Sequence, residues 1–149
     1  MADVREAILA RILAIVSAID GVQTAERNRI AFDDTQLPAV GVLEGDEEVA
    51  PNSLGRAARA SGRPYIVTAT PQVFVRVGGP SEDIGTDLNT LRAAIIRALL
   101  DDAQLNDLAA DDGGIQYAGM QSTLHAARSM VAATAMVFVI KYLIYPDRL

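Results

Sequence analysis

The stretch from Met130 to Tyr145 is apolar at nearly every position. Valine, isoleucine, phenylalanine and tyrosine are frequent in it, and these residues favour an extended strand over a helix. Alternate positions of a strand face opposite sides of a sheet, and here both sets are mostly apolar. Because a strand that is apolar on both faces has to be covered on both, we expect helices of this chain on one face and another subunit on the other.

The region from Arg63 to Val77 alternates between apolar and polar side chains, which predicts an antiparallel sheet with one wet face. Pro71 interrupts this region and has no N–H to donate to a neighbouring strand. It therefore predicts an edge position, a bulge, or two strands bent against each other. One side carries Tyr65, Val67, Ala69, Val73, Val75 and Val77, and the other carries Thr68, Thr70, Gln72 and Arg76 together with Ile66 and Phe74.

Two stretches repeat apolar residues at the spacing of a helix that packs on one side. The first runs from Val4 to Ile19, and Asp3 followed by Glu6 resembles a capping box at its start. The second begins around Thr86 and ends at Asp101-Asp102. Shorter elements are expected as strands at Arg27–Phe32, Leu37–Leu43 and Ile115–Met120, and as a further helical turn at Gln104–Ala110.

The order of these elements predicts a single α+β domain over residues 1–149. We expect one mostly antiparallel sheet with the two main helices packed on one face, and a long loop between the early strands. That loop, Glu44 to Gly62, has acids in its first half and arginines in its second. Long loops are usually functional or disordered. The loop is therefore either a solvated connector or a subunit or partner interface that becomes ordered by neighbouring copies, and its candidate contact residues are Glu44, Asp46, Glu47, Glu48, Arg56 and Arg59.

The net charge of the 149-residue chain is −6, from 19 acids and 13 bases. This balance disfavours nucleic-acid binding, which needs a basic face, but it is compatible with a wall past which DNA slides. The N-terminus does not resemble an export signal. The longest uncharged apolar run, Met130 to Ile140, is shorter than a transmembrane helix. We therefore expect a soluble protein that is made in a cytoplasm.

Residues suited to chemistry are scarce. The chain has no cysteine, which excludes disulfides and thiolate metal sites. Its single histidine, His125, has no neighbouring partner in the sequence and is expected to be structural or on the surface. Asp101, Asp102, Asp107, Asp111 and Asp112 do not have the spacing of an EF-hand, and Gly78-Gly79 lacks the context of a phosphate-binding loop. We therefore predict no catalytic, cofactor-binding or metal-binding residue, and a protein that is not an enzyme.

The order of the elements and their residue composition resemble those of the tail terminator, or tail completion, proteins of long-tailed bacteriophages. The resemblance extends over nearly the whole chain, although this family has no invariant catalytic motif. The matching segments are the opening helix Val4–Ile19, the leucine-proline-alanine-valine strand with its acids in Gln36–Gly45, the long loop, the valine-rich strand Tyr65–Val77, the helix with Asp87-Leu88 and Leu91–Ile95, and the final strand with Phe138–Tyr142.

The resemblance implies a virion protein that forms a hexameric ring on the last disc of the tail-tube protein. Such a ring stops tube polymerisation and presents a docking face to the head connector, while DNA passes through its hole. Its partners would be copies of itself, the tail-tube protein and a connector or neck protein, with no membrane and no cofactor. Two alternatives stay open: a neck or head-completion protein of the same fold, and a small regulatory α+β domain with a ligand pocket between its helices and its sheet.

Overall fold

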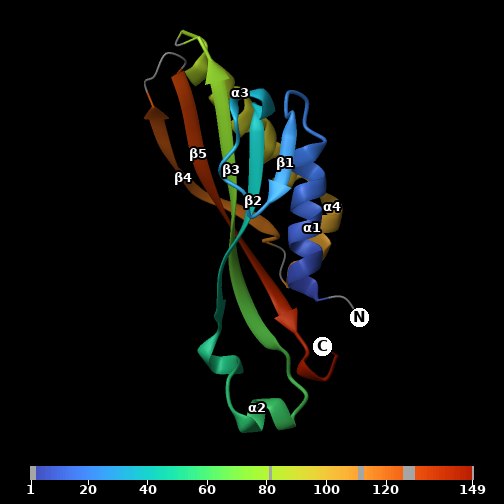
Figure 1. Ribbon diagram of the computed structural model, residues 1–149. Helices are drawn as coiled ribbons and strands as arrows, with labels where there is room; N and C mark the ends of the chain where they lie inside the picture. Colours follow the sequence, from blue (N-terminus) through green and yellow to red (C-terminus); the bar gives the residue numbers. More distant parts are fainter. Residues whose placement is uncertain (1–2, 81, 111–112, 126–129, 149) are drawn as a thin grey trace.

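The computed structural model describes residues 3–80, 82–110, 113–125 and 130–148 (Figure 1). Five strands form one mixed sheet in the order β1-β2-β3-β5-β4. β1 runs parallel to β2, and the other three pairings are antiparallel. The strands are β1 (Thr24–Arg27), β2 (Ala39–Val49), β3 (Tyr65–Gly79), β4 (Ile115–His125) and β5 (Met130–Ile144).

Two long helices and two short ones accompany the sheet, so the predicted α+β class and the mostly antiparallel sheet are confirmed. The long helices are α1 and α3, and α4 is the short helical turn expected after α3. The helices are α1 (Val4–Ser17), α2 (Arg56–Ala60), α3 (Ile84–Leu100) and α4 (Ala103–Asp107), and the 3-10 turns are η1 (Asp34–Gln36), η2 (Pro51–Ser53) and η3 (Pro146–Arg148).

One hydrophobic core joins the long helices to the sheet. α1 contacts β1 and β2, α3 contacts β3 and β5, and the two helices contact each other. We call the sheet face whose side chains enter this core the inner face, and the opposite one the outer face. The helices contribute Ile8, Leu9, Ile12 and Val16 from α1, and Ile84, Leu88, Leu91, Ile95 and Leu99 from α3.

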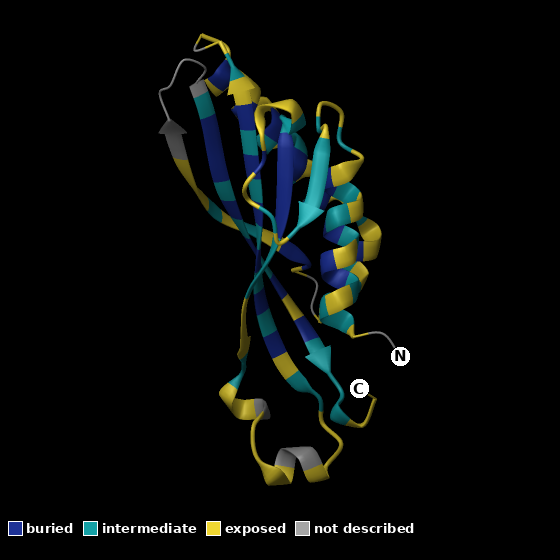
Figure 2. Cartoon of the chain, viewed as in Figure 1, coloured by how far each residue is buried: buried dark blue, intermediate teal, exposed yellow. Residues whose placement is uncertain are grey.

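The alternation predicted for β3 is confirmed by its burial, and the burial of β5 alternates in the same way (Figure 2). In β3 the odd-numbered side chains from Val67 to Val77 are buried, and the even-numbered ones are half-buried. In β5 the even-numbered side chains from Ala132 to Tyr142 are buried on the inner face. The odd-numbered set from Ala135 to Leu143 lies on the outer face, where Ala135, Val137, Val139 and Leu143 are only half-buried and Lys141 is exposed. One apolar face of β5 is thus covered within the chain, and the other is covered only in part.

The strand predicted at Arg27–Phe32 is wrong, because β1 spans Thr24–Arg27. Asn28 follows it with a φ of +55°, which is outside the strand region and ends the ladder. The next residues cross the outer face at Gly41, where a Cβ atom would lie 1.9 Å from the carbonyl oxygen of Arg29. Gly41 is therefore required by a close backbone approach, and Phe32 is buried where this crossing ends.

The long loop predicted at Glu44–Gly62 is also wrong in its first half. Residues 46–49 belong to β2 and pair with residues 67–70 of β3. Strand propensity is low for acidic residues, but pairing with the valine-rich β3 outweighs it. Past residue 45, β2 and β3 continue as a twisted arm, residues 46–70, with α2 at its end, and the last residues of β5 pair with β3 along it (Figure 1). Only residues 50–64 connect the two strands, and they contain η2 and α2.

Candidate interaction surfaces

A β-bulge marks the base of the arm. Leu43 pairs with Gln72 while Asp46 pairs with Thr70, so β2 holds one extra residue between these pairs. Gly45 in the bulge has a φ of +67°, and a Cβ there would lie 1.8 Å from the carbonyl oxygen of Thr70. The bulge is opposite Pro71, which has no N–H to offer the ladder. Of the three structures that Pro71 allowed, the bulge is thus the one formed, and bulges increase local twist where the arm begins.

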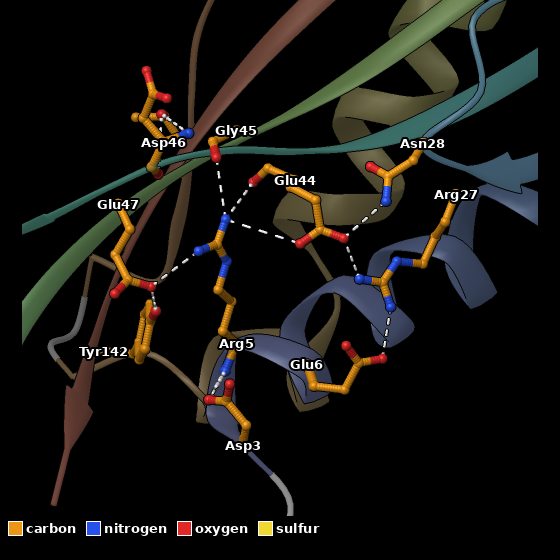
Figure 3. Close-up of polar contacts among 11 residues, drawn as sticks. Asp3, Arg5, Glu6, Arg27, Asn28, Glu44, Gly45, Asp46, Glu47 and Tyr142 are labelled. Atoms are coloured by element: carbon orange, nitrogen blue, oxygen red, sulfur yellow. Dashed lines mark hydrogen bonds and ion pairs between the residues drawn. The ribbon is translucent and has the colours of Figure 1, made fainter. Parts of the chain in front are cut away.

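Arg5 binds the backbone carbonyls of the bulge (Figure 3). Its Nη2 donates to the carbonyl oxygens of Glu44 at 3.3 Å and Gly45 at 3.1 Å, and its Nη1 donates to the Glu47 carboxylate at 3.3 Å. Asp3 caps α1 by accepting a 3.0 Å hydrogen bond from the Arg5 N–H. The first turn of α1 is therefore tied to the base of the arm through two backbone carbonyls and one carboxylate.

Tyr142 ties β5 to β2 at the same place. Its side chain is fully buried, and its hydroxyl donates to the carboxylate of Glu47. Burial, and then the adjacent negative charge of Glu47, raise the pKa of Tyr142 above its ordinary value. The phenol therefore stays protonated and remains a donor, and it joins strands that lie on either side of β3.

Glu44 is held by a second arginine. Its carboxylate accepts hydrogen bonds from the Arg27 guanidinium and, at 3.1 Å, from the amide of Asn28. These bonds, from Arg27 first and then from Asn28, lower the pKa of Glu44. Arg27 also donates to Glu6 of α1 at 2.6 Å. We call this connected set, Arg5, Glu6, Arg27, Glu44, Glu47 and Tyr142, the arm clamp.

The arm clamp is suited to holding elements together and not to proton transfer. Its arginines stay protonated at any physiological pH, and its carboxylates are occupied by guanidinium groups or by Tyr142. Among the residues that the structure describes, no group of three or more acidic, histidine or cysteine side chains is arranged to hold a metal ion.

The acidic run after α3 is used structurally. Asp102 accepts two hydrogen bonds from Arg11, at 2.6 and 3.0 Å, and caps α4 by accepting one of 2.8 Å from the Leu105 N–H. Asp111 and Asp112, also considered as cation ligands, lie outside the described residues. His125 is the last residue of β4, and its side chain is likewise not described.

The structure separates the six residues predicted as an interface. Glu44 and Glu47 enter the arm clamp, while Asp46 and Glu48 are exposed on the arm. Arg56 begins α2 at the far end of the arm (Figure 1). Arg59 lies in the same helix, and its side chain is not described. No local pattern indicated Arg5, Arg27 or Tyr142 as partners, since Tyr142 and Glu47, for example, are 95 positions apart. A glycine among acids and a proline within a later strand were the signals available for the bulge.

A pocket of about 230 Å³ lies at the end of the body opposite the arm. It opens between the turn after α1, the start of β2, the end of β3 and the first half of α3. Most of its lining is apolar, and two exposed carboxylates belong to it. The lining includes Asp20, Pro38, Val77, Asp87, Leu91 and Ala94.

Comparison of the sequence with protein-family models gave no match, and comparison with curated proteins gave no significant match either. Across the described ranges, every helix is too short or too polar to cross a membrane.

Proposed function

We propose that this protein is a tail terminator of a long-tailed bacteriophage, and that its copies close into a ring on the tail tube. The ring ends tube polymerisation and presents a docking face to the head connector. The observation that carries this proposal is the outer face of the sheet, which is apolar over much of its area and only partly covered within one chain.

The outer face is polar along most of β3, but along β5 it is mostly apolar, unlike that of an ordinary solvated sheet. Phe74, Val137, Val139 and Leu143 are half-buried there, and Ile66 is 36% exposed. An antiparallel sheet with one wet face normally carries polar residues on that face, and a contiguous exposed apolar patch commonly marks an interaction surface. Association with neighbouring copies would remove these side chains from water.

The arrangement of the helices supports the same assignment. We propose that α1 and α3 form one layer over the inner face, because each contacts the sheet, the two contact each other, and both enter the same core. With both long helices used in this way, the outer face is left for other subunits.

The acidic character of the chain fits a ring around a DNA path. The net charge is −6, and Asp46 and Glu48 are exposed on the arm. Glu47, which lies between them in the sequence, is instead bonded to Arg5 and Tyr142. We therefore assign the wall to surface acids such as Asp46 and Glu48, which would repel phosphate and let DNA slide.

A small regulatory ligand-binding domain is the second candidate, because the pocket between α3 and the sheet lies where such a domain would bind its ligand. Its volume of about 230 Å³ is below the roughly 300–1,000 Å³ typical of small-molecule sites. A neck or head-completion protein would use the same ring surfaces and differ only in its partner.

Electron microscopy of the purified protein tests the proposal. Closed rings with a central hole are expected, and their addition to tail tubes should block further growth of the tubes. A tight dimer with a bound metabolite would favour the regulatory domain. Rings that bind connectors but leave tube growth unchanged would favour the neck protein.

A further inference from the structure

We propose that the tip of the arm docks in the pocket at the opposite end of the next copy. In this contact Leu54 enters the pocket, and Arg56 faces the carboxylates of Asp20 and Asp87. The inference rests on the proposed function, since it specifies one contact between neighbouring copies of the ring. It concerns surfaces separate from the outer face of the sheet.

The arm tip combines an exposed apolar side chain with unpaired positive charge. Leu54 is 54% exposed, which is unusual for a leucine, and it precedes Arg56 by two residues. Neither Arg56 nor Arg63 forms an ion pair within the described part of the chain. Residues 50–64 contain three arginines and no acid, although the chain as a whole is acidic. The tip is therefore a cationic surface with an apolar side chain on it.

The pocket has the complementary character. Pro38, Val77 and Leu91 give it an apolar lining, while Asp20 and Asp87 are exposed beside it. Neither carboxylate forms an ion pair with another described residue. An aliphatic side chain followed by a cation fits such a site, because the apolar group is removed from water and the charge lies against two acids. Complementary charge of this kind fixes the register of an interface and speeds association.

The position of the two surfaces requires two copies. The pocket is formed at the end of the body where β3 finishes, whereas α2 lies at the far end of the arm (Figure 1). Tip and pocket of one chain therefore cannot meet. A contact between two different surfaces of identical chains is heterologous, and such contacts close into rings when the rotation between copies allows it.

Charge reversal at either surface tests the contact. R56E and D87R should each weaken self-association by about tenfold or more, as is typical when opposite charges become like charges across an interface. The double variant R56E/D87R restores opposite charges and should recover most of the wild-type association. The melting temperature of each variant serves as the folding control, and D20R provides a second reversal in case D87R disturbs the first turn of α3.

A mixture of the two single variants gives a sharper result. The R56E chain keeps an intact pocket, and the D87R chain keeps an intact tip. In the mixture the tip of the D87R chain meets a wild-type pocket, and the reversed tip of the R56E chain meets the reversed pocket of the D87R chain, as in the double variant. Assembly should therefore recover, with the two variants alternating. Substitution of Leu54, which is 54% exposed, by serine should also weaken assembly, whereas A10S should not, because Ala10 is exposed on α1, outside both surfaces and away from the outer face of the sheet.

Disulfide trapping identifies the contact directly, since the chain contains no cysteine. Under oxidation L54C/A94C should form disulfides between copies in a ladder of covalent oligomers, and L54C/I30C should not. The proposed contact is wrong if L54S, R56E and D87R assemble as well as the wild type and L54C/A94C gives no ladder. In that case the wild type still assembles, so the ring proposal stands. If the wild type does not assemble at all, both are wrong.

Discussion

The guanidinium of Arg5 donates a 3.1 Å hydrogen bond to the carbonyl oxygen of Gly45, the residue at which β2 changes register against β3. The first turn of α1 is thus bonded to the strand at the bulge itself. Because the arm leaves the body at this point, the contact sets where the arm begins. The tip of the arm is the part that we propose to contact the neighbouring copy. The stability of the base of the arm therefore affects the proposed assembly.

Gly45→Ala should be strongly destabilising. The residue has a φ of +67°, and its new Cβ would lie 1.8 Å from the carbonyl oxygen of Thr70. Left-handed backbone alone costs an alanine about 1–2 kcal/mol, and the clash adds to it. Gly62→Ala is the matched control, because Gly62 has a φ of +72° but nothing within 4 Å of the added atom. Urea unfolding of both variants measures the difference, and equal losses would show that the bulge tolerates a side chain.

Tyr142→Phe should lower the free energy of unfolding by about 1.5–3 kcal/mol, the usual range for a hydrogen bond to a charged group. The substitution leaves Glu47 without the hydroxyl that it accepts from, and the hydroxyl it removes is fully buried. Tyr145→Phe is the control, since that ring lies 4.6 Å from the Arg148 guanidinium, a contact that phenylalanine preserves. If denaturant unfolding shows no difference between the two variants, the clamp contributes nothing at Tyr142.

Asp102 should make stability depend on pH in the acid range. Hydrogen bonds from Arg11, and then from the Leu105 N–H, hold its pKa below the ordinary value. A carboxyl whose pKa is lower in the folded state stabilises the fold fully above its unfolded pKa of about 3.9, and this contribution is lost as the pH falls through the folded pKa.

The variant Asp102→Asn keeps a capping side chain but loses the charge. It should be less stable than the wild type at neutral pH, and the two stability curves should converge below about pH 4. Thermal unfolding across a pH series measures this, and a difference that stays constant down to pH 2 would show that the ion pair with Arg11 is not responsible.

Duplex DNA should not bind with a dissociation constant below about 100 µM at physiological salt. The chain carries a net charge of −6, and exposed acids are expected around the DNA path. Fluorescence anisotropy with labelled duplex measures this. Salt-sensitive binding in the range of about 1 µM would contradict the assignment of the wall.

Periodicity predicted the long elements well, because a buried stripe or a buried alternate row leaves a local signature. α1, α3, β3 and β5 are all present within a few residues of their predicted bounds. The shift of the early strand from Arg27–Phe32 to Thr24–Arg27 could not be seen, since it depends on a backbone crossing over Gly41. The acidic composition after Leu43 also led to the prediction of a loop, although these residues pair with β3 and form a strand.

The candidate site was predicted less well than the fold. Separation of acids and arginines along the sequence suggested one mixed-charge surface, but the strand places Glu44 and Glu47 beside α1 and leaves Arg56 at the arm tip. Ion pairs such as Arg11 with Asp102 join residues 91 positions apart and have no local pattern. The outer face is the exception, because the two-sided apolar character of β5 was visible in the sequence.

A lysine on the outer face should prevent assembly with little effect on the fold. Val139 is half-buried there, and Val139→Lys would place a charge in the proposed interface at a cost to monomer stability of about 1 kcal/mol or less. Ala10→Lys, which places the same charge at an exposed position of α1, is the control away from the outer face. Sedimentation should show normal assembly for the control only, and a Val139→Lys protein that assembles as the wild type does would remove the outer face from the interface.

The mass of the purified wild-type protein across a concentration series tests the central claim most directly. One chain has a mass of 15.8 kDa. A closed ring predicts a single dominant oligomer, with the hexamer expected from the resemblance, and no growth in size once that oligomer is complete. A strict monomer at the highest concentrations, from a protein that is also absent from tail particles, would contradict the account.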